Sequence, residues 1–477
     1  SGAASALGFL AAPLSFENAR SMPVEFKLGW NAQAVNEVLN SLVEQASRNL
    51  IEAGISPETI VTERSADMRL VGQMHDIAVP LPAGPLTEQS LDAIRAAFIA
   101  VYARRYTSPP EGARIEAINF RVRCSGPTPQ LSLVAEQDQS RATAQKGTRN
   151  AYFDHGFVET PVYDRYALKP GESLQGPAII EEREATTVIT PRDRLTIDEV
   201  GNLRISIGAQ DQAQIMIRAD MPMTEAVQVI ERDPIALEIM WSRLVNVVEE
   251  MWLTVCRTAF SLVISESQDF ACELLDARGE TLAHSPRAMP VFNLTLPLAV
   301  KALLERYPPE TLVEGDVLIT NDPWLCAGHL FDIAVVTPCF CDGKLVGLLG
   351  TVGHVSDIGG TKDSLRAREI YEEGFQIPPM KLFEAGVPNE SLYRLLAENV
   401  RNSDQVIGDL NSFVGANRLG AERLLSFMAD YGMEDLRALA HVVQERSEKA
   451  MRQAIRAIPD GVYHSTIQNN PLGEVLT

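Results

Sequence analysis

The sequence predicts a multidomain protein of mixed α/β (α+β) class, because three kinds of pattern follow one another along its 477 residues. Long helices are expected at 33–53 and 233–255, where apolar residues keep a 3.6-residue period. Short strands separated by turn residues fill 150–205, and an apolar hairpin is expected within 333–350. A chain of this length can hold two to four domains with separate cores.

Composition excludes several classes of function. The net charge is −21, which makes a nucleic acid or an anionic membrane surface an unsuitable partner. We find no apolar run of the ~18–20 residues that a membrane span requires. The six cysteines are scattered through a large chain, which favours reduced thiols in a cytoplasm over a disulfide framework.

The first 207 residues alternate helix and strand signals before the short strands begin. Residues 6–12 are apolar on all sides, so we expect them to be buried against a partner surface. Residues 125–148 are polar and lack periodicity, which predicts a mobile loop. The short strands that follow predict a small β-sandwich or barrel. The other expected elements are strands at 62–70, 77–80 and 118–124 and a helix at 87–102.

A boundary is expected at 208–232, which shows no deep pattern and which we interpret as a linker. It ends at Asp233-Pro234, an N-cap residue followed by proline at the first helical position. The helix from 233 to 255 is apolar over most of its circumference and should be central to the core of the second domain or to a subunit contact. Beyond it we expect a hairpin around 277–280, helices at 293–306, 389–400, 403–430 and 434–457, and a final strand and turn at 462–477.

The expected hairpin at 333–350 has chemistry-bearing residues at its open end. His329 and Asp332 precede its first strand, His354 follows its second, and Asp342-Gly343 forms the turn. The hairpin would therefore bring the two imidazoles and the carboxylate together, as a divalent metal requires. The alternative is that these loops are ordinary turns and that the histidines only cap them.

From residue 233 to about 461 the chain resembles the N-terminal half of the hydantoinase B/oxoprolinase family. The matching phrases occur in the family's order. They are DPI (233–235), SQDFAC (267–272), NDP (321–323), GHLFD (328–332), HVSDIGG (354–360), EGFQIPP (373–379) and IPDG (458–461).

Residues 1–207 resemble the C-terminal third of the hydantoinase A family, through SALG (5–8), VGQ (71–73), GPAIIEE (176–182) and ATTV (185–188). The two resemblances together imply the interior of a fused A–B polypeptide, as in 5-oxoprolinases. The family's actin-like ATPase core lies mostly N-terminal to these phrases, so ATP and Mg²⁺ are expected on an absent or partner part. The implied domains are the end of the A core (1–80), a β-rich, sandwich-like C-terminal domain of the A part (81–207), the linker (208–232) and an incomplete mixed α/β metal-binding B part (233–477).

The resemblance also implies a ligand set. The family's metal ligands resemble His329, Asp332 and His354, and a further aspartate matches Asp269. The expected ion is Zn²⁺ first and Mn²⁺ second.

Two further carboxylates are candidate catalytic residues. Glu373 borders the site in the family, as a general base or as a residue that orients a ligand, and a solvated helix end is the alternative. Asp322 is either a direct ligand or a residue that shapes its loop. The stretch 357–361 mimics a DxGGT phosphate loop, but its place after His354 favours a turn that shapes the metal pocket.

The resemblance implies ATP-dependent hydrolysis of a cyclic amide such as a hydantoin, 5-oxoproline or a related lactam. An A part would phosphorylate the carbonyl oxygen, and metal-assisted water attack in the B part would open the ring. The alternatives are an ATP-dependent ketone carboxylase of the acetone/acetophenone type and a non-catalytic scaffold subunit. A multi-subunit or homo-oligomeric assembly is expected.

Overall fold

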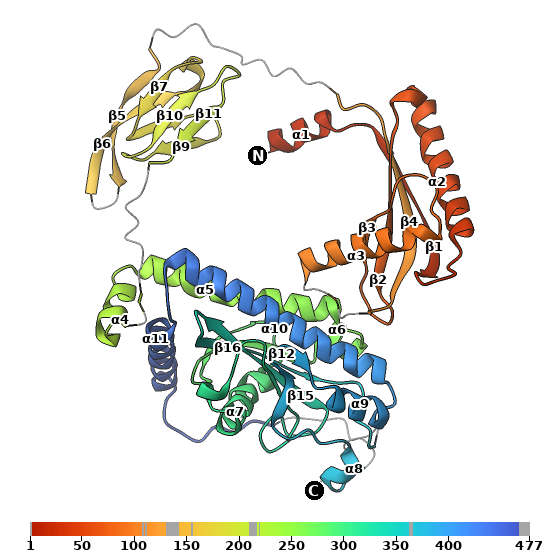
Figure 1. Ribbon diagram of the computed structural model, residues 1–477. Coiled ribbons are helices and arrows are strands. Elements are labelled where there is room, and N and C mark those ends of the chain that lie inside the picture. Colours follow the sequence, from red (N-terminus) through yellow and green to blue (C-terminus); the bar gives the residue numbers. More distant parts are fainter. Residues whose placement is uncertain are drawn as a thin grey trace. The chain divides into compact units, whose positions relative to one another are not determined.

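The computed structural model describes residues 2–106, 109, 112–129, 143–153, 156–208, 217–218, 220–361 and 366–466 (Figure 1). The chain divides into two compact units. The first unit holds residues 1–71, 76–101 and 112–215, and the second holds 72–75, 102–111 and 216–477.

The first unit contains an antiparallel sheet covered by a helix. The strand order is β1-β4-β2-β3, and α2 packs on β1 and β4. Leu39 and Leu42 of α2 and Phe120 and Val122 of β4 are fully buried between helix and sheet. The elements are α1 (Gly2–Ala11), β1 (Ser15–Glu25), α2 (Ala32–Glu52), β2 (Val61–Leu70), β3 (Ile77–Pro80), α3 (Leu91–Arg105) and β4 (Ile115–Ser125).

This sheet corrects one expected boundary. β4 pairs with both β1 and β2. A division between residues 80 and 81 would separate strands that share backbone hydrogen bonds. The boundary between the end of the A core and the β-rich domain therefore does not lie there.

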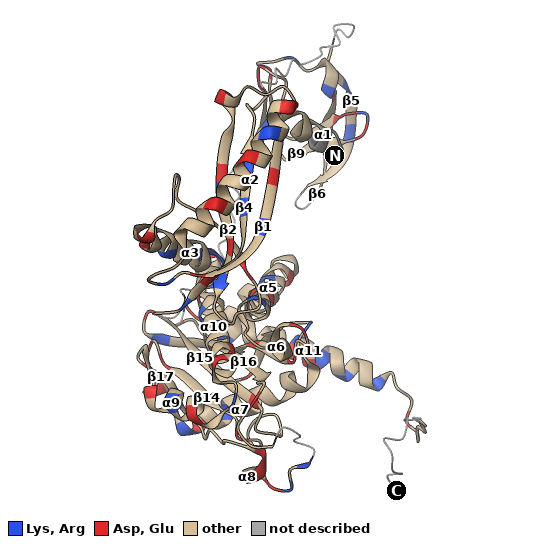
Figure 2. Cartoon of the chain, turned by 90° about the vertical axis from the view of Figure 1, so that its right-hand side faces the viewer, with Lys and Arg blue, Asp and Glu red and all other residues tan. Residues whose placement is uncertain are grey.

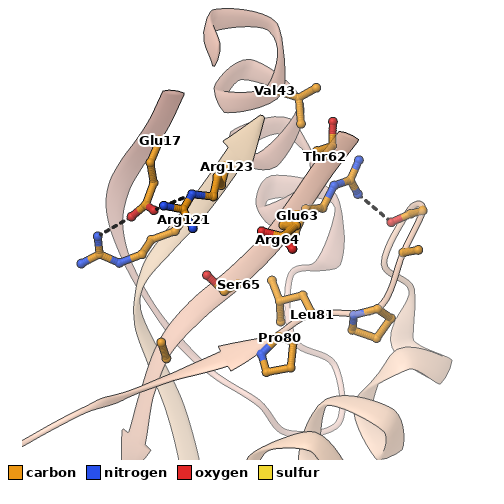
Figure 3. A pocket seen from close by; sticks show the side chains of 14 residues that line it. Glu17, Val43, Thr62, Glu63, Arg64, Ser65, Pro80, Leu81, Arg121 and Arg123 are labelled. Carbon is orange, nitrogen blue, oxygen red and sulfur yellow. Dashed lines mark hydrogen bonds and ion pairs between the residues drawn. The ribbon is translucent and has the colours of Figure 1, made fainter. Parts of the chain in front are cut away.

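The other face of this sheet is polar and charged. Cys124 of β4 contacts Ser47 of α2, so the alternate residues Arg121 and Arg123 lie on the opposite face. Acidic and basic residues both occur along these strands (Figure 2). Beside β2 lies a hollow of about 660 Å³, bordered by the loop 80–84 and by both arginines (Figure 3).

Two small sheets form the β-sandwich that the short strands predict. Their orders are β5-β6-β8-β9 and β11-β10-β7, and a common apolar cluster joins them. β5 begins at residue 145, so the expected loop 125–148 is corrected at its end, while 130–142 lie outside the described residues. The strands are β5 (Gln145–Phe153), β6 (Gly156–Asp164), β7 (Ser173–Gln175), β8 (Ala178–Glu181), β9 (Thr186–Ile189), β10 (Arg194–Ile197) and β11 (Leu203–Ser206).

The second unit is built on a larger sheet of order β13-β12-β16-β15-β14-β17-β18. Helices cover both of its faces (Figure 1). Ala334 and Val336 belong to the cluster under α7, whereas the backbone carbonyl of Val335 accepts a hydrogen bond from Asn417 of α10. The strands are β12 (Phe270–Asp276), β13 (Thr281–His284), β14 (Val317–Thr320), β15 (Asp332–Cys341), β16 (Lys344–His354), β17 (Met380–Glu384) and β18 (Val387–Pro388).

The helices of this unit confirm most of the expected ones. The Asp233 carboxylate accepts hydrogen bonds from the first backbone N–H groups of α5, which then buries Leu244, Val248 and Met251. The helices are α4 (Met223–Glu231), α5 (Pro234–Thr258), α6 (Leu262–Ser265), α7 (Pro290–Arg306), α8 (Ile370–Glu373), α9 (Glu390–Asn399), α10 (Ser403–Tyr431) and α11 (Arg437–Arg456).

Two expectations at the ends of this unit are corrected. The expected linker 208–232 contains a helix, α4. This helix packs on α5 and α11 and buries Ala226 and Ile230. Residues 462–466 are not a strand, and 467–477 lie outside the described residues. Among the helices that the structure describes, none combines the length and apolar character needed to cross a membrane.

Candidate metal centre

The candidate metal centre lies at the open end of the β15–β16 hairpin. The Asp342–Gly343 turn joins the strands, and Asp332, the first residue of β15, pairs directly with His354, the last of β16. Paired residues of neighbouring strands project to the same face of a sheet. The sequence prediction that this hairpin brings its outer ends together is therefore confirmed.

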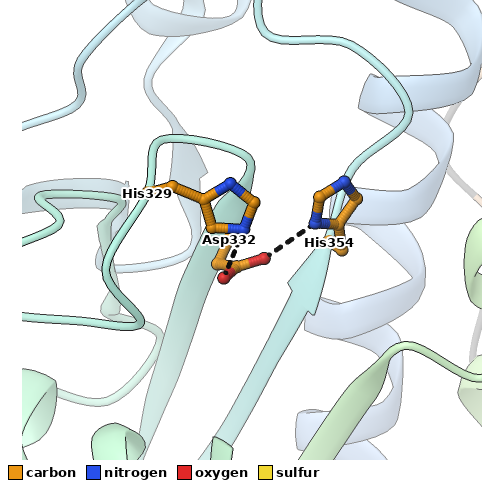
Figure 4. A group of neighbouring side chains, drawn as sticks. All are labelled: His329, Asp332 and His354. Atoms are coloured by element: carbon orange, nitrogen blue, oxygen red, sulfur yellow. Dashed lines mark hydrogen bonds and ion pairs between the residues drawn. The ribbon is translucent and has the colours of Figure 1, made fainter. Parts of the chain in front are cut away.

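The two imidazoles and the carboxylate converge (Figure 4). Nε2 of His329 lies 2.9 Å from Oδ2 of Asp332, and Nδ1 of His354 lies 3.1 Å from Oδ1 of the same carboxylate. The ring centroids of the histidines are 4.9 Å apart. One ligand atom from each of the three residues, hereafter the His–Asp–His cluster, lies within 4.8 Å of the others.

Burial and charge set the protonation of the cluster. The Asp332 carboxylate raises the pKa of His329 above its ordinary value, and the effect outweighs the opposing effect of burial. Burial raises the pKa of Asp332, but hydrogen bonds with His329 and His354 outweigh it and leave that pKa lowered. The cluster thus stabilises the anionic form of the Asp332 carboxylate next to a positively charged partner. A divalent cation can take the place of that positive charge.

Glu373, at the end of α8, lies next to the His329 ring on its Nδ1 side. Its Oε2 accepts a hydrogen bond of 2.9 Å from the backbone N–H of Leu330, and its Oε1 lies 3.4 Å from Nδ1 of His329. The residue is buried. Sequence reasoning left open a solvated helix end, and the structure instead places this carboxylate against the ring of a candidate ligand.

Asn321 ties together the two segments that carry His329 and Glu373. Its amide nitrogen donates to the carbonyls of Leu330, at 2.7 Å, and Phe375, at 3.0 Å. Its amide oxygen accepts from the N–H of Ile377 at 2.6 Å. The side chain is fully buried, so these bonds hold both segments in place behind the cluster.

Asp322 serves its own loop. Its carboxylate accepts hydrogen bonds of 3.0 Å from the backbone N–H of Trp324 and from the side-chain amide of Gln376. It does not belong to the cluster found among the described residues. The contacts match the loop-shaping alternative that the sequence left open.

Asp269 borders the cluster without belonging to its tightest part. It immediately precedes β12, and its carbonyl accepts the N–H of His354 at 3.0 Å. Burial raises the pKa of its half-buried carboxyl, and the charges of His354, Asp332 and His329 all act on it. Its carboxyl is therefore close enough to the cluster for those charges to act on it.

One contact was missed by sequence reasoning. The ring of Phe331 stacks on that of His354, with centroids 5.1 Å apart and planes 9° from parallel. Phe331 lies between two ligand candidates in the sequence, and an apolar residue there gives no signal of its own because the pairing depends on the hairpin register.

Comparisons with known proteins identify the family of the chain. The hydantoinase B/oxoprolinase family model matches residues 233–471, and the hydantoinase/oxoprolinase C-terminal domain model matches 26–205. The chain belongs to the hydantoinase B/oxoprolinase family. The resemblance inferred from the sequence phrases is thereby confirmed.

Two similar proteins and one solved structure illustrate the range of the match. 5-Oxoprolinase 1 of Arabidopsis thaliana is 28% identical over 453 residues, which cover 91% of this chain and 34% of that protein. The caprolactamase subunit beta of Pseudomonas jessenii is 33% identical over 237 residues, covering 49% of this chain and 40% of the subunit. The crystal structure of an ATP-dependent caprolactamase from that organism shares 33% identity, with a TM-score of 0.45, over 48% of this chain and 40% of its own. The chain thus spans about a third of the length of the 5-oxoprolinases that it matches.

Proposed function

We propose that the chain supplies the metal centre of an ATP-dependent enzyme that hydrolyses a cyclic amide. The observation that carries the proposal is the convergence of His329, Asp332 and His354 at one hairpin end in a member of this family. The similar proteins are named for 5-oxoproline and caprolactam, which are both cyclic amides. A planar, resonance-stabilised amide resists attack, and ATP can supply the activation.

The donor set fits a divalent ion. Two imidazole nitrogens and one carboxylate suit Zn²⁺ first and Mn²⁺ second, and the half-buried Asp269 is the proposed fourth ligand. An ion held there would polarise a carbonyl oxygen and lower the pKa of a water molecule. Phe331 fixes the plane of His354 by stacking.

Of the two candidate catalytic residues, Glu373 is proposed to orient His329 and Asp322 to keep its loop in shape. ATP and Mg²⁺ are assigned to a hydantoinase A-type part or partner. Two of the similar proteins are named as subunits, which supports a multi-subunit assembly. All six cysteines, which lie in the described part of the chain, are free thiols, and a cytoplasmic setting is proposed with them.

The test is an assay of the chain combined with its nucleotide-binding part, with ATP and each of 5-oxoproline, hydantoin and acetophenone, with and without bicarbonate. We expect ring opening of a cyclic amide that depends on ATP and is lost in Asp332→Asn. If product forms only from the ketone, and only when bicarbonate is present, a carboxylase would replace this proposal. Absence of any metal from the purified protein would favour a scaffold subunit.

A further inference from the structure

The turn at 357–361 and helix α8 are joined backbone to backbone. The N–H of Thr361 donates to the carbonyl of Glu372 at 2.8 Å, and the N–H of Phe375 donates to the carbonyl of Ile358 at 2.7 Å. Gly359 and Gly374 form a β-bridge between these bonds. The turn and the end of α8 therefore form one unit, hereafter the Glu373 bracket (residues 357–361 and 370–375).

Glycines allow the two parts of the bracket to approach this closely. A Cβ atom on Gly360 would lie 2.3 Å from the carbonyl oxygen of Glu372 and 2.3 Å from the carbonyl carbon of Glu373. A Cβ atom on Gly374, which has a φ of +152°, would lie 2.3 Å from the carbonyl oxygen of Ile358. The sequence of the Gly359-Gly360 pair imitates a phosphate loop, but these glycines pack against the backbone at the end of α8.

An ion pair fixes the outer side of the bracket. The guanidinium of Arg401 lies 2.6 Å from Oδ1 of Asp357, which is buried. The backbone N–H of Arg401 also donates to Asp357, and its guanidinium donates to the carbonyl of Gly360. The N–H of Gly359 donates to the same aspartate at 3.2 Å. The Asp357 carboxylate is therefore occupied by hydrogen bonds and an ion pair with residues of the protein.

We propose that the Glu373 bracket is a positioning device for the metal centre, in which Glu373 holds Nδ1 of His329 so that Nε2 faces the ion. The two contacts of Glu373, with Leu330 N–H and with His329 Nδ1, fix both the loop and the ring of that ligand. A carboxylate behind a ligand histidine fixes the ring's tautomer and orientation. This inference rests on the proposed metal-binding function.

The experiment measures the affinity of the full chain for Zn²⁺ alone, by competition with a chromophoric chelator. The test variants are Glu373→Gln, which keeps the side-chain shape, and Gly360→Ala, which disturbs the bracket without changing a charge. The matched controls are Glu422→Gln, at an exposed carboxylate on α10 of the same unit, and Gly461→Ala, where an added Cβ meets nothing within 4 Å. Arg401→Lys, which weakens the bracket without added bulk, replaces Gly360→Ala if that variant does not fold.

We expect Glu373→Gln to weaken Zn²⁺ binding by about 10–100-fold, the usual effect of losing such a partner, and the bracket variant to weaken it in the same direction. Both controls should bind like the wild type. The visible spectrum of bound Co²⁺ should change in Glu373→Gln and stay the same in Glu422→Gln, because only Glu373 contacts the ligand ring.

Equal Zn²⁺ affinity and an equal Co²⁺ spectrum in Glu373→Gln and wild type would overturn the inference. An equal loss in Glu422→Gln would also overturn it, since the effect would then be one of net charge. If the wild-type chain binds no Zn²⁺, Mn²⁺ or Co²⁺, the proposed function fails and the inference falls with it, so the two failures are distinguishable.

Discussion

The two units each bring a carboxylate of very low exposure together with nitrogen-bearing side chains, yet the two clusters differ in what they can bind. In the first unit, Nε of Arg121 lies 2.9 Å from Asp67, and its Nη1 lies 3.2 Å from Glu17. In the second unit, His329 and His354 flank Asp332 at 2.9 and 3.1 Å. Asp67 is 5% exposed and Asp332 is 3% exposed, so burial does not separate the two cases.

The difference lies in the nitrogen donors. A guanidinium stays protonated and has no lone pair to offer, so Arg121 can pair with carboxylates but cannot bind a cation. An imidazole can lose its proton and then offers a lone pair to a cation. The hairpin cluster therefore becomes a ligand set when the histidines are neutral, whereas the sheet-face cluster remains an ion pair.

The largest effect should come from the core that supports the hairpin. Val248 of α5 is fully buried, so Val248→Asp places an unpaired charge in that core and should cost several kcal/mol or abolish folding. Thermal and urea unfolding measure the change. Ile235→Asp is the matched control, because Ile235 lies on the same helix and is 74% exposed. An unchanged melting temperature in Val248→Asp would show that this face of α5 is not in the core.

A smaller loss should follow removal of the side chain that ties the two segments behind the cluster. Asn321→Ala leaves the carbonyls of Leu330 and Phe375 and the N–H of Ile377 without their buried partner. The expected cost is about 2–5 kcal/mol, measured by urea unfolding, together with weaker Zn²⁺ binding. Asn399→Ala, at an exposed asparagine, is the control. Equal stabilities of the two variants would show that the Asn321 bonds contribute little.

A still smaller effect is expected on the pH dependence of the melting temperature of the metal-free chain, to which, of the two clusters, only the His–Asp–His cluster contributes through an imidazole. The pKa of His329 is raised by Asp332, so the ion pair stabilises the fold fully below the ordinary histidine pKa of about 6.5 and loses that contribution as pH rises through the higher folded value. The melting temperature should therefore fall as the pH rises above about 6.5. His329→Gln should flatten this part of the profile. An identical slope in that variant would assign the pH dependence to other groups.

The smallest effect is expected on the sheet face of the first unit. The Arg121 side chain is 39% exposed, so water screens its ion pairs, and Asn119 still donates a hydrogen bond to the buried Asp67 carboxylate when Arg121 is replaced. Screened ion pairs contribute about 1 kcal/mol or less. Arg121→Gln should therefore change the free energy of unfolding by no more than that, and added salt should reduce the difference further. A loss of several kcal/mol would mean that this cluster, too, is a demanding buried network.

Local patterns in the sequence were enough to predict the hairpin, the long helix α5 and the convergence of His329, Asp332 and His354, because strand alternation and a two-residue turn determine which residues face each other. The sequence could not reveal that β4 joins β1 and β2, since the paired residues lie between 45 positions (Leu70 with Ile115) and 110 positions (Ser15 with Ser125) apart. It also could not reveal that Asn321 and Phe331 support the cluster, because their contacts depend on how the 321–331 loop folds against β16 and residues 375–377. The error at 208–232 arose because nine helical residues, α4, lie within an otherwise weak pattern.

The most direct test of the metal centre is a titration of the metal-free chain with Zn²⁺, and separately with Mn²⁺, that reports both stoichiometry and affinity. The wild type and Arg121→Gln should each bind one ion per chain with equal affinity. Asp332→Asn should weaken binding by more than the roughly 10–100-fold that loss of an outer partner costs, because it removes a direct ligand. Binding of one ion by Asp332→Asn as tightly as by the wild type, or no binding by the wild type, would contradict the account.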